Sequence, residues 1–545
     1  MLSLLALSKL QHPIAKRLML ILIGALYPLG FSPFDFWPLA FLSIILLVNE
    51  TVASIERNQW AIVVNSKESS TAQDKKEISL FSIGLYWAFG AFGLGTSWVY
   101  VSIHEFGHAP VLGAIGISFL FVLTLSLVKA AGIHLIGKMV IGSGRNMLLL
   151  IIPFAWVFFE FMQTWLFSGF PWLFAGYTQI DGPLWMLSTW TGVYGVSWFM
   201  LAIASCLILL MRGYFISRAV SGDPFSRTSL MFILAVLVSV PLMAWLLPQV
   251  AITPSKKSIK VALVQPNIGQ EKKWDRRHFS AIVDVLFEQS REHWGADLLV
   301  WPEGAIPAYK HQVEDIMLDL NRRAKEFNTD LLLGLPVYYP KEKISYAALI
   351  SLGKYQQTYH KQVLVPFGEY VPLGNILRGL IEFLNLPMSN FSPATTKQQV
   401  MSFSDYQVVP AICYEITYPG ILHELIADAD ENSDKAKLLV TVSNDAWFGD
   451  SFGPYQHMQM ARMRALELGI PLVRSTNDGI TAVVDAKGNM LSQLDRYSQD
   501  TLSYEVSLVS HQTLYRKYGL FSIYWILTIS LIIFLIQLIK NKYYS

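Results

Sequence analysis

Long apolar runs fill about a third of this chain and constrain its fold more than any other feature. Seven precede residue 250 and an eighth closes the chain, at about 14–30, 34–49, 80–101, 110–136, 146–167, 185–211, 229–248 and 519–539. A helix needs about 20 mostly apolar residues to cross a bilayer. Only 15% of the residues are charged, against roughly 25% in soluble domains. We therefore expect membrane spans rather than the buried helices of a soluble protein.

Lysine and arginine in the short connections predict how these spans are oriented. They occur before the first run, after the last and in alternate connections: Lys9, Lys16, Arg17, Arg57, Lys67, Lys75, Lys76, Lys129, Lys138, Arg145, Arg212, Arg218, Arg227, Lys540 and Lys542. The other short connections, at about 31–33, 102–109 and 168–184, contain neither residue. Positive charge stays in the cytoplasm. The first two runs, at about 14–30 and 34–49, must therefore each cross the membrane, and both termini are expected to be cytoplasmic. Residues 249–518 are then periplasmic, beside a bacterial inner membrane.

Residues 258–510 have the pattern of a single α/β domain. Short β-rich runs recur along it: IKVALVQP, DLLVWPE, DLLLGLP, YAALISL, VVPAICYE, KLLVTVSND, PLVRSTN and TAVVDAKG. Helical stretches around 276–293, 313–327 and 454–468 lie between them. Strands that alternate with helices are typical of an α/β fold. We therefore expect a membrane domain at 1–250 with about seven transmembrane helices, this α/β domain, and a final transmembrane helix at 519–539.

The cysteine count and the net charge exclude some functions. The chain has two cysteines, Cys206 in an apolar run and Cys413 in the α/β part, so we expect no disulfide framework. A lone cysteine in a folded domain is either a small buried hydrophobe or a nucleophile, and burial is the commoner case. The net charge of +2 gives no basic excess for binding nucleic acid.

Three residues in the α/β part have the chemistry of thiol catalysis. Cys413 and Glu303 each end an apolar strand, and Lys361 follows a third. Catalytic groups gather beyond the carboxyl ends of strands in such sheets. A thiol needs a base because the thiolate is the attacking species, a carboxylate can be that base, and an ammonium can stabilise an oxyanion. The spacing alone leaves open that Glu303 is in a surface ion pair and that Lys361 is solvated.

Two further signals compete with this interpretation. His104-Glu105-Phe106-Gly107-His108 matches the zinc-protease pattern H-E-x-x-H. The pattern works only on a helix, and here Gly107 and Pro110 interrupt it, so we expect a polar loop and no metal. Glu160 lies inside a predicted span. Intramembrane carboxylates are often functional, but helix packing by a hydrogen bond explains this one equally well.

Long motifs in both halves of the chain resemble the apolipoprotein N-acyltransferases, the integral membrane family of the nitrilase (carbon-nitrogen hydrolase) superfamily. In the membrane half the motifs are PLGFSPFDFWPLA and FSGFPWLFAGYTQ. In the other half they are ADLLVWPEGAIP, HKQVLVPFGEYVP, AICYEI, VSNDAWFGDS and RSTNDGITAVVD. The resemblance covers nearly the whole chain, and the motifs follow the family's order.

This resemblance implies a fold and a set of site residues. The fold is a multi-span α-helical membrane domain plus an α/β nitrilase-like αββα sandwich domain at 258–510. The resemblance assigns Glu303 as general base, Lys361 as oxyanion stabiliser and Cys413 as nucleophile. It gives supporting roles to four further residues: Trp274, Glu369, Tyr414 and Glu415. The sequence departs from the family pattern at Gly304, where threonine is expected, and at Gln163, where arginine is expected.

The resemblance also implies a two-step acyl transfer without a cofactor. A membrane phospholipid donates a fatty acyl chain to Cys413, and the α-amine of a diacylated apolipoprotein then accepts it. We expect a monomer, with an apolar lid around Trp274 and residues 369–391 to exclude water from the thioester. The alternatives are a membrane-tethered amidase or nitrilase that uses the same triad, and a non-catalytic scaffold of the lipoprotein pathway.

Overall fold

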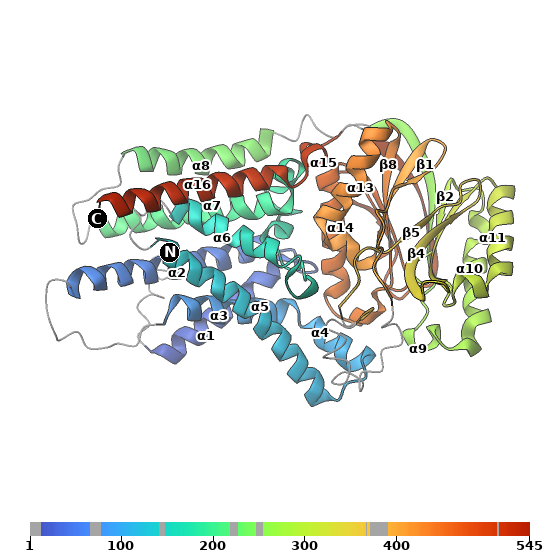
Figure 1. Ribbon diagram of the computed structural model, residues 1–545, viewed down its shortest axis with the longest axis horizontal. Helices are drawn as coiled ribbons and strands as arrows, with labels where there is room; N and C mark the ends of the chain where they lie inside the picture. The colour runs from blue at the N-terminus through green and yellow to red at the C-terminus, as the bar shows by residue number, and fades with distance from the viewer. Residues whose placement is uncertain are drawn as a thin grey trace. The chain divides into compact units, whose positions relative to one another are not determined.

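The computed structural model describes residues 12–65, 78–140, 148–217, 227–246, 254–366, 368–370, 391–509 and 512–544. The chain forms two compact units (Figure 1). The first contains Met1–Tyr100, Leu112–Pro248 and Leu520–Ser545, and the second contains Val101–Val111 and Gln249–Gly519. The expected domain ends at 250 and 510, and most of the expected lid at 369–391, lie outside the described residues.

Helices occupy most of each predicted apolar run. The main ones are α1 (Pro13–Leu26), α2 (Trp37–Asn65), α3 (Leu80–Gly95), α4 (Trp98–Val101), α5 (Val111–Val140), α6 (Leu148–Met162), α7 (Ser188–Ser217), α8 (Arg227–Leu246) and α16 (Phe521–Tyr544). Within the described residues, four segments are long and apolar enough to cross a membrane: Pro13–Gly30, Trp37–Arg57, Val111–Met139 and Trp185–Arg212. The pair Leu80–Gly95 and Trp98–Phe106 qualifies together but bends by 54°. The number of crossings stays a prediction.

Glycines allow α1 and α3 to pack backbone against backbone. A Cβ atom on Gly24 would lie 1.9 Å from the carbonyl oxygen of Trp87, and one on Gly90 would lie 2.0 Å from that of Ile21. No side chain fits at such distances, because both neighbours are main-chain atoms. Small residues at the contact are the usual way in which apolar helices approach closely.

Two buried polar side chains fix the loop that follows α6. Glu160 Oε1 accepts hydrogen bonds from Trp156 Nε1 at 2.7 Å and from the main-chain N–H of Ala175 at 2.8 Å. Gln163 Nε2 lies 3.4 Å from two carbonyl oxygens in the segment 170–172. Glu160 therefore holds the loop to the helix, which favours the packing interpretation. The side-chain amide of Gln163 contacts the same loop.

The second unit contains two sheets joined at one point. The first has the order β5 (Thr358–His360), β4 (Ile344–Leu352), β3 (Asp330–Tyr339), β2 (Leu298–Val300), β1 (Pro254–Gln265) and β12 (Asp500–Val509). The second has β6 (Met401–Ser402), β7 (Tyr406–Ile412), β8 (Ala436–Ser443), β9 (Leu472–Thr476), β10 (Ala482–Val484) and β11 (Met490–Gln493). The pairing of Val509 with Lys437 connects β12 to β8.

A layer of helices covers each sheet. Helices α10 (Phe279–Ser290) and α11 (Glu314–Glu326) pack on the first sheet, and α13 (Pro419–Asn432) and α14 (Gly453–Leu468) pack on the second. Figure 1 shows the strands between these two pairs of helices. The core of the first half contains fully buried side chains such as Leu286, Leu320 and Leu333. Helix, sheet, sheet and helix thus form the αββα sandwich that the family resemblance implied.

The segment that carries the H-E-x-x-H pattern belongs to the α/β unit. The expectation of a loop is wrong over its first half, because α4 continues through a π-helical turn before Gly107 ends it. Ser102 Oγ donates a hydrogen bond to the carbonyl oxygen of Trp447 at 2.7 Å. His104 Nδ1 lies 2.8 Å from the main-chain oxygen five residues later. Because the helix stops at Gly107, the two histidines of the pattern do not share a helical face.

Candidate active site

Strand ends bring Glu303, Lys361 and Cys413 to one edge of the sandwich. Glu303 follows β2 by three residues, and Lys361 and Cys413 come directly after β5 and β7. Strand β5 is antiparallel to β4, and β4 to β3, so β5 has the direction of the parallel pair β2 and β3. Strands β7 and β8 share this direction through β12 and β1. The edge is thus the one where ligands bind in open α/β sheets.

Lys361 is completely buried and lies between two carboxylates. Its Nζ is 3.0 Å from Glu303 Oε1 and 2.7 Å from Glu369 Oε1. The second oxygen of Glu369 accepts a hydrogen bond from the main-chain N–H of Val365 at 2.8 Å. Burial by itself lowers the pKa of Lys361, but the charges of Glu303 and Glu369 raise it well above its usual value. The side chain is therefore an ammonium ion at neutral pH.

Cys413 begins a tight turn in a strained backbone conformation. Its φ angle is +52°, in the left-handed region that non-glycine residues rarely adopt. Such strain persists at functional sites when the surrounding structure enforces it. Burial raises the pKa of the Cys413 thiol, the Glu303 carboxylate raises it further, and the Lys361 ammonium opposes both. Cys413 is therefore a thiol at neutral pH, and it needs a base before it can attack.

The main chain around Glu303 fixes the direction of its carboxylate. The N–H of Asn444 donates to Glu303 Oε2 at 3.0 Å, and Lys273 Nζ donates to the Glu303 carbonyl oxygen at 3.1 Å. Gly334 on β3 lies directly behind, where a Cβ atom would be 2.7 Å from Glu303 Cα. Burial lowers the pKa of Lys273 to about 8, although the nearby carboxylates oppose this shift. Glu303 is thus held by contacts to its main chain as well as by the contact of its carboxylate with Lys361.

Glu415 joins the Lys361 segment to the Cys413 turn. One of its oxygens accepts from the N–H of Gln362 at 2.5 Å, and the other accepts from the N–H of Ile412 at 2.7 Å. These donors are next in sequence to Lys361 and Cys413. Burial raises the pKa of Glu415 to about 7, while the main-chain hydrogen bonds oppose that shift. A single buried carboxyl group therefore sets the spacing between ammonium and thiol.

The other two predicted supporting residues follow residues of the site in sequence, Tyr414 after Cys413 and Trp274 after Lys273. Tyr414 follows Cys413, and its buried ring packs against Tyr418, with 5.3 Å between centroids. Trp274 is partly exposed and ends the short helix α9 (Gln270–Lys273). The indole Nε1 of Trp274 is buried and has no hydrogen-bond partner among the described residues.

Comparisons with known proteins agree in both halves of the chain. The family described as "Apolipoprotein N-acyltransferase N-terminal domain" matches residues 23–207, and "Carbon-nitrogen hydrolase" matches residues 260–516. The apolipoprotein N-acyltransferase of Vibrio parahaemolyticus serotype O3:K6 is 32% identical over 542 residues, or 96% of this chain and 97% of the relative. That of Shewanella oneidensis is 36% identical over 528 residues, or 93% and 92%.

The chain belongs to the apolipoprotein N-acyltransferase family. It is therefore an acyltransferase with a carbon-nitrogen hydrolase domain, and its apolar helices make it a membrane protein. A solved carbon-nitrogen hydrolase from Helicobacter pylori G27 aligns with 50% of this chain and 94% of its own, at 14% identity and a TM-score of 0.35. The resemblance drawn from the motifs is confirmed.

Gly304, where this acyltransferase departs from the family pattern, has a local explanation. Its φ angle is +56°, a conformation that suits glycine. A Cβ atom there would lie 3.5 Å from Lys273 Nζ, in ordinary contact. Glycine in place of threonine therefore removes a side chain next to Lys273 and does not alter the position of Glu303.

Sequence reasoning missed several polar residues that surround the triad. Lys273 precedes Trp274 in EKKW, and Asn444 lies in the family motif VSNDAWFGDS, so both were near residues already singled out. Lys273 contacts the main-chain oxygen of Glu303, and Asn444 contacts the Glu303 carboxylate through its main-chain N–H. Contacts of main-chain atoms cannot be inferred from residue types. A buried group behind Cys413 was missed as well: Ser443, Asp445, His457 and Arg474.

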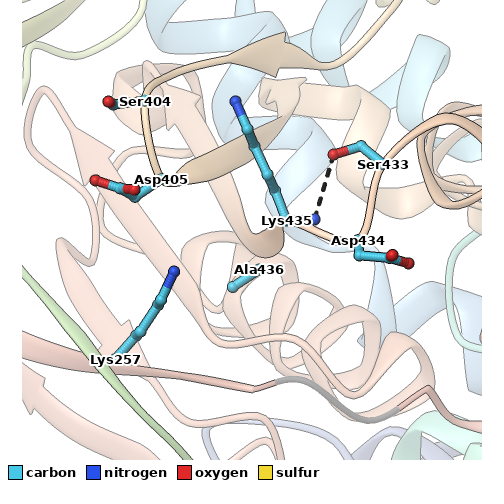
Figure 2. Close-up of a pocket in the computed structure, with 7 residues that line it drawn as sticks. All are labelled: Lys257, Ser404, Asp405, Ser433, Asp434, Lys435 and Ala436. Carbon is cyan, nitrogen blue, oxygen red and sulfur yellow. Dashed lines mark hydrogen bonds between the residues drawn. The ribbon is translucent and has the colours of Figure 1, made fainter.

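A separate surface cleft of about 430 Å³ lies at the other end of the second sheet. Figure 2 shows its lining residues: Lys257, Ser404, Asp405, Ser433, Asp434, Lys435 and Ala436. Asp405 precedes strand β7, which is seven residues long, and Cys413 follows that strand. At about 3.3 Å per residue, the strand separates the cleft from the thiol. The cleft shares no residue with the triad.

Proposed function

We propose that this chain transfers a fatty acyl chain from a membrane phospholipid to the α-amino group of the N-terminal S-diacylglyceryl-cysteine of apolipoproteins. The names of its relatives support acyl transfer to an apolipoprotein. The observation that carries the proposal is the Lys361 ammonium, which lies between Glu303 and Glu369 beside the Cys413 thiol. In this proposal Glu303 is the general base, Lys361 stabilises the oxyanion and Cys413 is the nucleophile.

The first half-reaction forms a thioester on Cys413. Glu303 takes the thiol proton, and the sulfur attacks the ester carbonyl carbon of the phospholipid. The carbonyl oxygen becomes an oxyanion, which the Lys361 ammonium and the main-chain N–H of Tyr414 stabilise. The carbon–oxygen ester bond then breaks, and the leaving alkoxide takes the proton from Glu303. The products are a lysophospholipid and the acyl-enzyme.

The second half-reaction transfers the acyl chain to the amine. The neutral α-amine of the lipoprotein cysteine attacks the thioester carbonyl, which returns the oxyanion to the same donors. Glu303 accepts a proton from the attacking nitrogen. The carbon–sulfur bond breaks, and the thiolate of Cys413 recovers its proton from Glu303. An amide has formed, and the enzyme has its starting protonation state.

Glu369 supports this cycle by staying with Lys361 while Glu303 changes charge. When Glu303 is protonated, Lys361 would be a buried cation without a counter-ion if Glu369 were absent. An unpaired buried charge is strongly destabilising. The 2.7 Å contact between Lys361 and Glu369 keeps the ammonium in place for the oxyanion.

Membrane anchoring suits two lipid-bound substrates. We propose a bacterial inner-membrane monomer with seven helices in residues 1–250, a periplasmic catalytic domain at 258–510, and a last helix at 519–539 that returns the chain to the cytoplasm. The lysine and arginine bias of the connections supports this orientation. Lateral diffusion in one leaflet then delivers both the phospholipid and the diacylated lipoprotein.

The test uses the full-length protein in phospholipid vesicles with a synthetic diacylated lipopeptide. We expect a fatty acyl adduct on Cys413 before lipopeptide is added, and N-acylated lipopeptide afterwards, both detected by mass spectrometry. Cys413→Ser is the control and should abolish transfer. Free fatty acid as the main product would indicate a hydrolase instead. Full activity of Cys413→Ala in cells that lack the native enzyme would indicate a scaffold.

A further inference from the structure

A buried polar chain behind the nucleophile ends on the Cys413 carbonyl oxygen. His457 on α14 is only 1% exposed, and its Nε2 lies 3.1 Å from that oxygen. Its Nδ1 lies 3.0 Å from Arg474 Nη2 and 3.2 Å from Asp445 Oδ1. Arg474 also donates to Asp445 Oδ2 at 2.8 Å. The three residues come from three elements: His457 from α14, Asp445 from the turn after β8, and Arg474 from β9.

The contacts select one tautomer of His457. The Cys413 carbonyl oxygen only accepts hydrogen bonds, so Nε2 must carry the single proton of a neutral imidazole and donate it there. Nδ1 is then the acceptor, and the guanidinium of Arg474, which only donates, is its partner at 3.0 Å. Asp445 Oδ1, at 3.2 Å from Nδ1, accepts instead from Ser443 Oγ at 2.6 Å. Burial lowers the pKa of His457, and the positive charge of Arg474 lowers it further against the opposing charge of Asp445. The imidazole therefore stays neutral, and its only hydrogen-bond donor is the Nε2–H that faces the Cys413 carbonyl oxygen.

That carbonyl shares a peptide unit with the N–H that stabilises the oxyanion. The peptide between Cys413 and Tyr414 is planar, and in a trans peptide the C=O and N–H bonds point in opposite directions. A donor that fixes the carbonyl therefore fixes the direction of the Tyr414 N–H as well. A hydrogen bond to the carbonyl also polarises the unit and strengthens the N–H as a donor. The peptide leaves a residue with a strained φ angle of +52°, and the contact with His457 holds the carbonyl that follows it.

We infer that His457 is a positioning residue that aims the Tyr414 N–H at the oxyanion by holding the carbonyl of the Cys413–Tyr414 peptide. The inference rests on the proposed function, because only acyl chemistry forms an oxyanion there. It assigns Asp445 and Arg474 the task of setting the imidazole tautomer. In this inference His457 acts through the Cys413 carbonyl oxygen and takes no part in the bond changes at the sulfur.

The test separates a reaction that needs the oxyanion site from one that does not. Acylation of Cys413 by phospholipid passes through an oxyanion, whereas alkylation by iodoacetamide at a saturated carbon does not. Both rates are measured on the full-length protein in vesicles, in a Cys206→Ala background. In His457→Asn the amide replaces Nδ1 and leaves no donor at the carbonyl. We expect acylation to fall about 10–100-fold, while alkylation stays within about threefold, the scale of an unchanged thiol.

His457→Gln is the matched rescue, because its amide nitrogen reaches the position of Nε2 and should recover most of the acylation rate. Ser503→Ala removes a hydrogen bond between β12 and His293 at 3.0 Å and should change neither rate. Equal acylation in the wild type and in His457→Asn overturns the inference, as does a parallel fall of both rates. His457→Phe is measured if His457→Asn does not fold, and failure of both to fold also counts against a positioning role. Wild-type protein that forms no acyl-enzyme refutes the proposed function instead.

Discussion

At the scale of single residues, the site depends on how charges share a small buried volume. Lys361 is an ammonium between two carboxylates, and the same carboxylate charge that holds it opposes ionisation of Cys413. The thiol is thus kept protonated, and in the proposed mechanism Glu303 removes its proton. This arrangement differs from a preformed thiolate–cation pair, in which a lowered thiol pKa supplies the nucleophile.

The protonation state of Cys413 predicts how its alkylation depends on pH. Because burial and Glu303 raise the thiol pKa, the thiolate fraction should keep growing from about pH 7 to about pH 10, past the region where a thiol with the ordinary pKa near 8.5 would level off. Iodoacetamide alkylation in a Cys206→Ala background should therefore rise across that range without a plateau. A rate that is already constant from neutral pH upward would contradict the assignment.

Glu303→Gln is the control for this profile. Removing the carboxylate charge lowers the thiol pKa, so the alkylation profile should move to lower pH. Acylation by phospholipid should fall in the same variant, because the base is lost. An alkylation profile that does not move would show that Glu303 does not act on Cys413 through its charge.

The family motifs allowed prediction of the three triad residues and of two carboxylates that hold them, Glu369 and Glu415. They did not predict the other supports, Lys273, Asn444 and His457. Glu303, Lys361 and Cys413 follow strands whose apolar pattern is plain, and the family motifs surround them. His457 lies 44 residues after Cys413 in the middle of a buried helix, and its partner is a main-chain oxygen. A contact of that kind can follow only from the tertiary fold.

At the scale of elements, the close approach of β3 to the Glu303 loop determines the geometry. Gly334 leaves no room for a side chain, since a Cβ atom would lie 2.7 Å from both Glu303 Cα and the Pro302 carbonyl oxygen. The backbone of one strand thus serves as the wall behind the proposed base. The contact joins the loop after β2 to the strand beside it.

Gly334→Ala should displace Glu303 and reduce acylation at least about tenfold, with a loss of stability of about 1–3 kcal/mol from overpacking. Gly295→Ala is the matched control. Gly295 has a φ angle of +100° but nothing near its Cβ position, so alanine there strains the backbone by about 1–2 kcal/mol without touching the site. Acylation per folded molecule should stay normal in the control. Equal activity of the two variants would refute the steric argument.

Other elements show where prediction from sequence ends. The long strands and the helices near 276–293, 313–327 and 454–468 were predicted, because each carries a clear apolar period. The three-residue strand β5 and the two-residue strand β6 are too short to show one. Helix α13 and strand β12 were not predicted.

At the scale of the whole molecule, each unit has a buried ionic group of its own. In the helical unit, Arg212 donates to Glu56 Oε2 at 2.6 and 3.0 Å and to Asn49 Oδ1 at 3.0 Å. In the α/β unit, Arg516 and Lys437 both pair with Asp430 at 2.7 Å. Breaking one partner of such a buried pair leaves an uncompensated charge.

Arg212→Met should therefore destabilise the helical unit by about 3–5 kcal/mol. The double variant Arg212→Met with Glu56→Gln removes both charges and should recover most of that loss. Thermal unfolding in detergent measures both. If the double variant is no more stable than the single one, the pair does not act as a unit.

The position of β12 has a consequence for how the protein is made. Strand β1 pairs with β12, which begins 235 residues after β1 ends, so β1 lacks one neighbour until β12 has been synthesised. Until then β1 has an open edge, and open edges recruit foreign strands. The sandwich therefore closes only after β12 has left the ribosome. A nascent chain that already contains Cys413 still lacks the enclosure around its thiol, so we expect acyl chemistry to begin only once β12 is paired.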